Sequence, residues 1–512
     1  MKSLTRLDDT EEARGRLAEI LRARGEWFFS ADTREGASVP LGRGDWELEI
    51  AHNALYFSCR MKRGEMRVWR VAGWEWTAGR LRLDATRRMG AERAVLELVP
   101  RASVREGIEA LKAARRAACE RLAALVCEAT FNARVERVSL SAGARRSEPG
   151  RYARIILRVG RERVALTGAV VALGAHEVDA FLASALLWWT RGVGKSNGAG
   201  ARRLRLVVSH DLKDTTAEHL ALLREEVRRE IELFEIDEGW QSVSPVAIPS
   251  RAGIFDTPTR VRHPPRFELS ETAARIVALA PEAIDAVRAR HGETLRFHGL
   301  SFARVRNWMR RERVWFGTGR APRVLLEDDN LPQLSKLIDE LREHRRAVPP
   351  DRRHALYTAA PEAWLESLLR RDITRLDPGL RLAPLHAQFR TPSRGASAGA
   401  RPIDLLALRL DGRLVVIELK VSEDAALPLQ GADYWRRVNA QHRAGHIRRA
   451  RLFGDAEISD EPPLVYLVAP LLRFHRSFQT LARMISPAIE LYRFDLGEDW
   501  RAGVRVARRS EL

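Results

Sequence analysis

The feature that most constrains the fold of this sequence is a pair of apolar runs, 405–410 and 414–419, separated by Asp411-Gly412. An Asp-Gly pair between two such runs predicts a tight turn and hence an antiparallel β-hairpin. Asp404 precedes the first run and Glu418 ends the second. A hairpin that turns at Asp411-Gly412 therefore places Asp404 opposite the Glu418 end.

Three ionisable groups then meet at one end of an apolar hairpin. Glu418 and Lys420 are two residues apart, so they share one side of the strand. Two carboxylates in a partly buried site repel each other and gain most from a shared divalent cation. Oxygen ligands favour Mg2+ or Mn2+, with Asp404, Glu418 and the backbone carbonyl of Leu419 as candidate ligands.

This arrangement predicts metal-assisted hydrolysis of a phosphodiester. Lys420 would orient or deprotonate a water molecule, or stabilise developing negative charge. The chain contains seven lysines among 87 Lys plus Arg residues. Because arginine cannot act as a base, a lysine at this position favours the catalytic interpretation. The alternative is that Asp404 and Glu418 are ordinary strand-end residues that face water.

The order Asp404, then Glu418-Leu419-Lys420, resembles the signature of the PD-(D/E)XK nuclease superfamily. Gln430 and Tyr434 downstream are similar to the QxxxY motif of its RecB-type and lambda-exonuclease-type branch. The resemblance covers roughly residues 350–512. It implies a restriction-endonuclease-like αβββαβ core.

Upstream of the hairpin, Glu366 resembles the helix acid that this branch uses as a further metal ligand. Glu362, one helical turn earlier, remains the alternative. Gln430 and Tyr434 are four residues apart on an expected helix and would hold the substrate. The alternative for Tyr434 and its neighbour Trp435 is packing in the core.

The resemblance implies a divalent-metal-dependent deoxyribonuclease with a role in DNA repair or in defence against foreign DNA. Its metal would be Mg2+ (or Mn2+), bound by Asp404, Glu418, Glu366 and Leu419. A catalytically silent nucleic-acid-binding protein on a nuclease scaffold is the alternative function.

Composition agrees with a polyanionic partner. The net charge is +19 and the isoelectric point is about 10.7, which favours DNA, with RNA also open. The three cysteines lack disulfide or zinc-site spacing. No apolar signal segment or membrane-spanning run is present, so we expect a cytoplasmic protein without membrane contact. The oligomeric state is open, and a homodimer is compatible with the sequence.

The chain divides into several expected regions of a multidomain α/β protein. They are a β-rich N-terminal domain (1–102), an α/β domain (103–245), a mainly helical basic connecting region (246–350) and the nuclease-like domain (351–512).

The α/β domain repeats the order of elements expected in the nuclease-like domain. Aligning the two hairpins places Ala153, Thr167 and Ala169 at the positions of Asp404, Glu418 and Lys420. The repeat would then be a degenerate nuclease-like fold that binds without cutting. A generic α/β domain is the alternative.

Arginines alternate with aromatic residues in two parts of the chain. In 304–316 this pattern suits a nucleic-acid strand, with charges on phosphates and rings on bases, although a solvated helical face gives the same sequence. In 67–76 the tryptophans either stack on bases or fill a small β core. The candidate nucleic-acid contacts are Arg304, Arg306, Trp308, Arg310, Arg311, Arg436 and Arg437.

Overall fold

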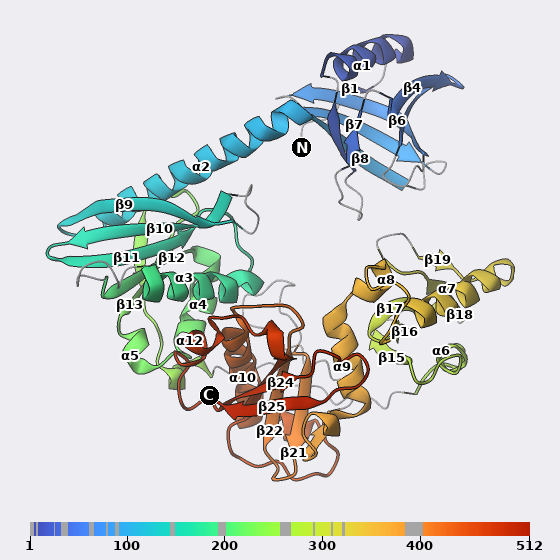
Figure 1. The fold of residues 1–512 in the computed structure, drawn as a ribbon. Coiled ribbons are helices and arrows are strands. Elements are labelled where there is room, and N and C mark those ends of the chain that lie inside the picture. Colours follow the sequence, from blue (N-terminus) through green and yellow to red (C-terminus); the bar gives the residue numbers. More distant parts are fainter. Residues whose placement is uncertain are drawn as a thin grey trace. The chain divides into compact units, whose positions relative to one another are not determined.

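The structure is a computed structural model. It describes residues 5–6, 9–24, 26–31, 39–42, 44–60, 66–77, 80–87, 92–143, 149–192, 201–255, 268–289, 292–308, 311–319, 323–383 and 403–512. This part of the chain forms four β-sheets with associated helices, a mixed α/β architecture as the sequence predicts (Figure 1). It contains no helix that is both long and apolar enough to cross a membrane.

The chain forms two compact units. Unit 1 contains residues 1–114, 143–149 and 319–322, and unit 2 contains the rest. Unit 1 is β-rich, as predicted, and its strands run in the order β3-β2-β8-β7-β6-β5-β4, with β1 paired to β6. Its elements are β1 (Thr5–Arg6), α1 (Thr10–Arg24), β2 (Trp27–Ala31), β3 (Val39–Leu41), β4 (Trp46–Ala51), β5 (Ala54–Arg60), β6 (Met66–Thr77), β7 (Arg80–Arg87) and β8 (Glu92–Pro100).

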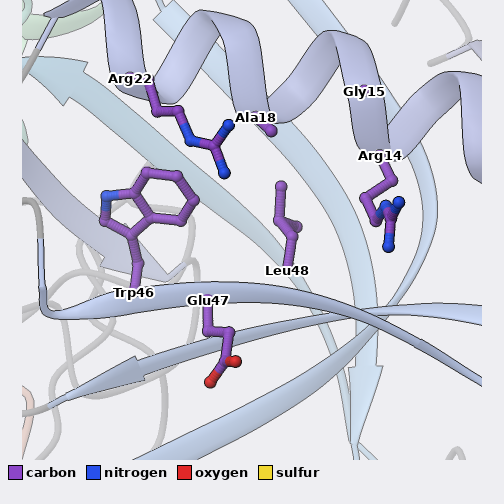
Figure 2. Close-up of a pocket in the computed structure, with 7 residues that line it drawn as sticks. All are labelled: Arg14, Gly15, Ala18, Arg22, Trp46, Glu47 and Leu48. Carbon is purple, nitrogen blue, oxygen red and sulfur yellow. The ribbon is translucent and has the colours of Figure 1, made fainter.

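The tryptophans of unit 1 serve its core. Trp69 is fully buried, and Trp74 and Trp76 pack against the same cluster, which favours core packing over base stacking. Helix α1 adds Leu17 and Leu21 to that cluster. Arg14, Ala18 and Arg22 lie on an adjacent face of α1. Together with residues of β4 they line a cavity of about 830 Å3 between the helix and that strand (Figure 2).

Unit 2 contains the same sheet topology twice. The first sheet has the order β14-β13-β12-β11-β10-β9, and the second has the order β20-β21-β22-β23-β24-β25. In the first, β10–β11 and β13–β14 are antiparallel, whereas β11–β12 and β12–β13 are parallel. The corresponding pairs of the second sheet have the same directions. We refer to these two folds as the first copy and the second copy.

The helices occupy equivalent places in the two copies. The first copy has α2 (Arg101–Glu128), β9 (Ala133–Ala142), β10 (Pro149–Val159), β11 (Glu162–Ala169), α3 (Val178–Gly192), β12 (Arg203–Ser209), α4 (Lys213–Leu220), α5 (Glu225–Arg228), β13 (Ile231–Ile236) and β14 (Val243–Val246). The second copy has α9 (Pro361–Arg371), β20 (Leu380–Leu382), β21 (Leu405–Arg409), β22 (Leu414–Leu419), α10 (Leu427–Arg443), α11 (His446–Arg449), β23 (Leu464–Pro470), α12 (Phe478–Ala482), β24 (Leu491–Leu496) and β25 (Val506–Glu511).

The two copies pack against each other through helices. Helix α3 contacts α12, α10 contacts α4, and α3 contacts α10, so that one apolar cluster joins both copies. The backbone contacts are reciprocal: Arg224 N donates to Met484 O at 2.8 Å, and Ser486 N donates to Leu222 O at 2.9 Å. Reciprocal pairs of this kind are the contacts of a two-fold interface, here formed within one chain.

A third sheet corrects the expectation of a mainly helical region at 246–350. Its strands are β15 (Ile284–Ala289), β16 (Gly292–Phe297), β17 (Leu300–Trp308), β18 (Arg311–Phe316) and β19 (Val324–Leu325), which pair in chain order. Helices α6 (Glu271–Val277) and α7 (Leu331–His344) pack on one face, and α8 (Ala355–Thr358) follows. The interleaved arginines and apolar residues of 300–316 therefore reflect the two-residue period of strands.

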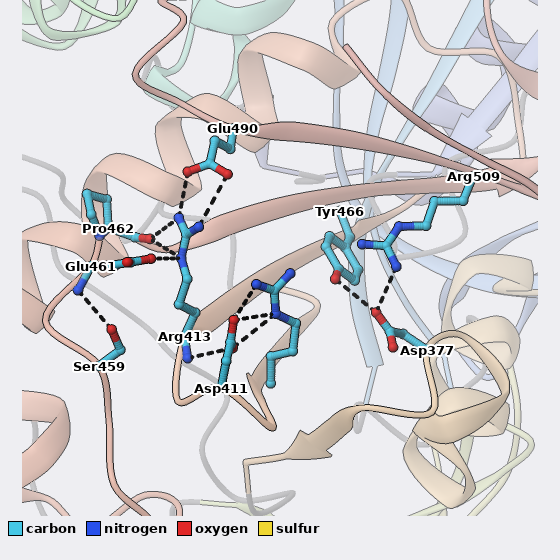
Figure 3. A network of polar contacts seen from close by, with 10 residues as sticks. Asp377, Asp411, Arg413, Ser459, Glu461, Pro462, Tyr466, Glu490 and Arg509 are labelled. Carbon is cyan, nitrogen blue, oxygen red and sulfur yellow. Dashed lines mark hydrogen bonds and ion pairs between the residues drawn. The ribbon is translucent and has the colours of Figure 1, made fainter.

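The second copy's hairpin is fixed at its turn as well as at its open end. Arg413, beside the turn, donates to Pro462 O and to both carboxylate oxygens of Glu490, the latter at 2.7 and 3.2 Å (Figure 3). Gly412 adopts a φ of 82°, which favours glycine, as expected for the Asp-Gly turn. The turn thereby holds the register that determines which residues meet at the other end.

Arg345 joins the third sheet to helix α9. Its guanidinium is fully buried and donates to backbone carbonyls of the β16–β17 turn and of the segment before α9, those of Phe297, His298, Leu356, Ala359 and Ala360. Gly299 in that turn has a φ of 78°, and a Cβ there would lie 1.9 Å from Ala363 O. The turn is therefore in close backbone contact with α9.

We expect Arg345→Met to lower the free energy of unfolding by about 3–5 kcal/mol, because several buried carbonyls lose their donors together. Urea denaturation followed by circular dichroism measures the change. Arg346→Met, at an exposed neighbouring position, is the matched control and should change stability by less than about 0.5 kcal/mol. Equal effects of the two substitutions would contradict the anchoring role.

Candidate active site

The hairpin of the second copy brings Asp404, Glu418 and Lys420 together. Asp404 directly precedes β21, Glu418 lies near the end of β22, and Lys420 directly follows it. Strand pairing of Leu405 with Ile417 places Asp404 opposite Glu418. The sequence predicted this juxtaposition from the Asp-Gly turn alone.

The three side chains interact in a buried site. Lys420 Nζ donates to Glu418 Oε1 at 2.8 Å, and Leu419 N donates to Asp404 Oδ2 at 2.9 Å. Glu418 is 2% exposed and Lys420 is 8% exposed. The cluster has one cation, Lys420, for two carboxyl groups. Because buried charges are costly unless compensated, ionising both carboxyl groups here is unfavourable.

Burial and mutual repulsion disfavour two ionised carboxylates here. Burial raises the pKa of Asp404 to about 6, against the Leu419 N–H and the Lys420 charge, which lower it. Burial also raises the pKa of Glu418 well above its ordinary value, and the Asp404 charge adds to this effect. Although burial alone would lower the pKa of Lys420, the Glu418 carboxylate raises it, so Lys420 is a cation at neutral pH.

The site contains a buried acceptor that suits a cation. Glu418 Oε2 has no hydrogen-bond partner among the described residues, nor does Gln430 Oε1. The amide and carbonyl of one strand residue point to the same edge, so the carbonyl of Leu419 lies on the Asp404 side of β22. Two carboxylates with an unfilled acceptor and a nearby carbonyl fit a hard divalent cation such as Mg2+ or Mn2+.

The two acids of helix α9 lie near different members of the site. Glu366 accepts a 2.6 Å hydrogen bond from Arg370 Nε, and its charge contributes to the raised pKa of Asp404. The Glu362 charge instead contributes to the raised pKa of Lys420. Arg370 binds Oε1 of Glu366, and the choice between Glu366 and Glu362 as a metal ligand stays a prediction.

The described part of the chain contains no group of three or more His, Cys, Asp or Glu side chains placed to hold a metal ion. The acidic ligand set assembled at the hairpin is therefore the pair Asp404 and Glu418. Glu362 makes no ion pair with any described residue, which leaves it available to approach the site from α9.

Gln430 and Tyr434 lie buried on helix α10, beside the hairpin. Tyr434 packs in the core with residues such as Leu406 and Val416. Burial raises the pKa of its hydroxyl, and the charges of Glu418 and Asp404 raise it further, so Tyr434 is close to both acids. Tyr434 therefore packs in the core, one of the two alternatives in the sequence, and its contact with a substrate stays a prediction.

Gly431 explains how α10 approaches the sheet so closely. A Cβ at this position would lie 2.6 Å from Leu467 Cδ2 and 3.0 Å from Val465 Cγ1 on β23. Only glycine lets the first turn of α10, which carries Gln430, pack this closely on the sheet.

Arg436 and Arg437 are a correction to the expected nucleic-acid contacts. Both pair with the buried carboxylate of Asp433, and Arg436 also pairs with Glu218 of the first copy at 3.1 Å. His219 lies in the same cluster, 3.0 Å from Asp179 and 3.9 Å from Asp433. These arginines are held at the interface between the copies, where the buried acids need them as compensating cations.

The other expected contacts fall on the third sheet. Arg304 and Arg306 are exposed on β17. Trp308 and Arg311 pair across β17 and β18, and Arg310 lies outside the described residues. The open alternative of a helical face is wrong, because the segment is a β-hairpin.

The first copy lacks the acids of the second. Strand pairing places Arg154 opposite Thr167, so Arg154 and not Ala153 is the structural counterpart of Asp404. The difference arises because Arg154 and Thr167 are 13 positions apart, whereas Asp404 and Glu418 are 14 positions apart. At the carboxyl ends of β11 and β12 the first copy has a cavity of about 590 Å3, lined in part by Val171, Val207 and Trp240.

Sequence reasoning missed Arg370 and Arg296. The spacing of Glu366 and Arg370, four residues apart on a helix, is a detectable ion-pair signal. Arg296 lies 3.8 Å from Glu366 but belongs to the third sheet, and no local pattern connects the two segments.

Comparison of the chain with known family models, with curated proteins and with solved structures gave no match. The interpretation of the site therefore depends on its own geometry and chemistry.

In the metal-free protein we expect Asp404→Asn to stabilise the fold at pH 8. Folding raises the pKa of Asp404 from 3.8 to about 6, so its contribution to stability is full below pH 3.8 and is lost as the pH rises through 6. Removing the charge should raise the free energy of unfolding at pH 8 by about 1–3 kcal/mol, and by less at pH 5. Urea denaturation in EDTA at both values measures this.

Asp411→Asn at the turn of the same hairpin is the matched control. The Arg409 side chain lowers the pKa of Asp411, so this substitution should reduce stability at pH 8. A destabilising or pH-independent effect of Asp404→Asn would show that the two buried carboxyl groups do not repel each other.

Proposed function

We propose that the chain is a metal-dependent nuclease that hydrolyses DNA phosphodiester bonds at Asp404, Glu418 and Lys420. The observation that carries the proposal is the unpartnered Glu418 Oε2, buried beside Asp404 and Lys420. The order of α9, β20, β21, β22, α10 and β23 also agrees with the αβββαβ core that the PD-(D/E)XK resemblance implies.

Asp404, Glu418 and the Leu419 carbonyl would hold Mg2+ or Mn2+, with Glu362 or Glu366 of α9 as a further acid. When bound, the ion activates water and neutralises charge on the phosphate. The protein supplies a buried site in which the two carboxylates are held by Leu419 N and Lys420 Nζ. Rigid placement of these groups is what positions a substrate for in-line attack.

Lys420 acts as a fixed cation in this proposal. The Glu418 carboxylate raises the pKa of Lys420 in the metal-free protein, so its ammonium group would stabilise negative charge that develops on the phosphate. Gln430, with its free Oε1, is placed to orient water or the lysine. The Tyr434 hydroxyl, on α10, is near enough to Glu418 and Asp404 for their charges to raise its pKa, and it would contact the substrate there.

A catalytically silent nucleic-acid-binding protein is the second candidate function. The observation that favours it is the lack of a three-acid metal group in the described residues. Metal dependence separates the two functions, because a nuclease requires Mg2+ or Mn2+ whereas simple binding responds chiefly to salt.

Cleavage of linear duplex, closed-circular and single-stranded DNA tests the proposal, with Mn2+, Mg2+ or EDTA. We expect metal-dependent cutting that falls at least about 100-fold in Glu418→Ala and in Lys420→Ala. Glu423→Gln, an exposed acid just beyond the site, is the control and should retain activity. Binding without cutting in every metal would favour the silent scaffold.

The two α9 acids should differ in their effect on metal binding. We expect Glu362→Gln to reduce the rise in melting temperature that Mn2+ produces. Glu366→Gln should leave that rise in place and lower the metal-free melting temperature, because Arg370 loses its charged partner. Differential scanning fluorimetry measures both quantities, and the reverse result would assign Glu366 as the ligand.

A further inference from the structure

The described helices of residues 268–358 leave one face of the third sheet uncovered. Helices α6 and α7 pack on the face that contains Leu295, Val305 and Val314. The opposite face carries Arg304, Arg306 and Arg313, all exposed, with the half-buried Trp315. Arg323 reaches the same face, where it donates to Ser301 Oγ at 2.7 Å. We call Arg304, Arg306, Arg313, Arg323 and Trp315 the arginine face.

The charges of the arginine face are not neutralised by neighbouring acids. No ion pair joins any of its four arginines to a described carboxylate. Burial lowers the pKa of Arg323, and the charges of Arg304 and Arg306 lower it further. Glu312 is the nearest acid in sequence, but its side chain lies on the covered face of the sheet. There it accepts a hydrogen bond from Thr272 N at the start of α6. Like charges held together in this way favour a polyanion.

The aromatic ring is placed among these charges. Trp315 pairs with Arg304 across β17 and β18, and the Arg306 guanidinium lies 5.9 Å from the Trp315 ring centroid. A strand with free base faces can stack on such a ring while its phosphates meet the arginines. A duplex keeps its bases stacked internally, so it offers this ring no free base face away from its ends.

A continuous series of contacts leads from the arginine face to the candidate active site. Arg296 pairs with Ser301 across β16 and β17, next to Arg323. It forms an ion pair with Asp285 at 2.7 Å and lies 3.8 Å from Glu366 on α9.

Helix α9 completes the series. Arg370 bonds Glu366 at 2.6 Å and donates to the backbone oxygen of Asp404 at 3.1 Å. Arg371 ties the same helix to the third sheet through the carbonyls of Pro281 and Ile284. The sheet and the acid pair are therefore held together by α9.

We propose that the arginine face binds single-stranded nucleic acid and leads it to Asp404 and Glu418, with Arg296 as the positioning residue that joins the sheet to α9. This inference rests on the proposed function and names its substrate: a single strand, or the unpaired end of a duplex. Phosphates would contact the arginines and one base would stack on Trp315.

Fluorescence anisotropy of a labelled oligothymidylate, with the full chain carrying Glu418→Gln in EDTA, tests binding without cleavage. We expect the Arg304→Ala and Arg306→Ala double variant to weaken binding about tenfold at about 0.15 M salt. The slope of log affinity against log salt should fall by about 0.7 for each phosphate that the variant no longer neutralises. Trp315→Leu should weaken single-strand binding at least about fivefold with little change in the salt slope.

The matched control is the Arg275→Ala and Arg342→Ala double variant, which removes the same charge from the helices on the covered side of the sheet. It should leave single-strand affinity within about twofold of the parent. Equal losses in both double variants, or tighter binding of a duplex of the same length, would overturn the proposal.

The positioning role of Arg296 is tested by the segments of the chain that a bound oligonucleotide contacts. In the Glu418→Gln chain, a photoreactive thymidine oligonucleotide should cross-link both to 300–316 and to 404–420. Arg296→Ala should keep the first cross-link and lose the second, and Arg296→Lys should restore part of it. Retention of both cross-links in Arg296→Ala would remove its positioning role.

These outcomes separate this inference from the proposed function. Single-strand binding that depends on the arginine face, without cleavage in any metal, would sustain the inference and overturn the nuclease. Metal-dependent cutting that is indifferent to Arg304, Arg306 and Trp315 would do the opposite.

Discussion

The site depends on two carboxyl groups that the hairpin buries together with a single lysine. Their mutual repulsion is set by backbone pairing, because Asp404 and Glu418 are opposite each other in an antiparallel register. Leu419 N donates to Asp404 and Lys420 Nζ donates to Glu418, while Glu418 Oε2 accepts no hydrogen bond from a described residue. Neutral residues at positions 404 and 418 would give this buried hairpin a lower free energy. Acids at these positions therefore indicate a functional role, such as binding a cation, that compensates the cost of their burial.

The surrounding structure keeps that unfavourable cluster in place. Arg413 fixes the turn end of the hairpin through Glu490, and Gly431 lets α10 approach β23 closely. Arg345 binds the third sheet to the segment before α9. Helix α9 itself carries the two further acids near the site. Rigid support of this kind is what a reactive constellation requires, because small displacements of its groups are costly.

Local sequence patterns predicted much of this site, but they did not predict the contacts between residues far apart in the chain. The Asp-Gly turn and strand alternation were sufficient to bring Asp404, Glu418 and Lys420 together, since hairpin register is a local property. Arg436 and Arg437 were wrongly expected at a nucleic-acid surface, because both pair with the buried Asp433 and Arg436 also pairs with Glu218 of the first copy. The third sheet was expected to be mainly helical, since its arginines obscured the two-residue alternation. The shorter spacing of the first hairpin likewise moved the counterpart of Asp404 from Ala153 to Arg154.

The reciprocal contacts between the copies have a stoichiometric consequence. Leu222 and Arg224 of the first copy meet Met484 and Ser486 of the second as two subunits of a symmetric dimer would. A true dimer of the second copy would present two acid pairs, whereas here the equivalent of Asp404 is Arg154. The hairpins of one chain therefore provide one such acid pair, whereas a symmetric dimer of the second copy would provide two.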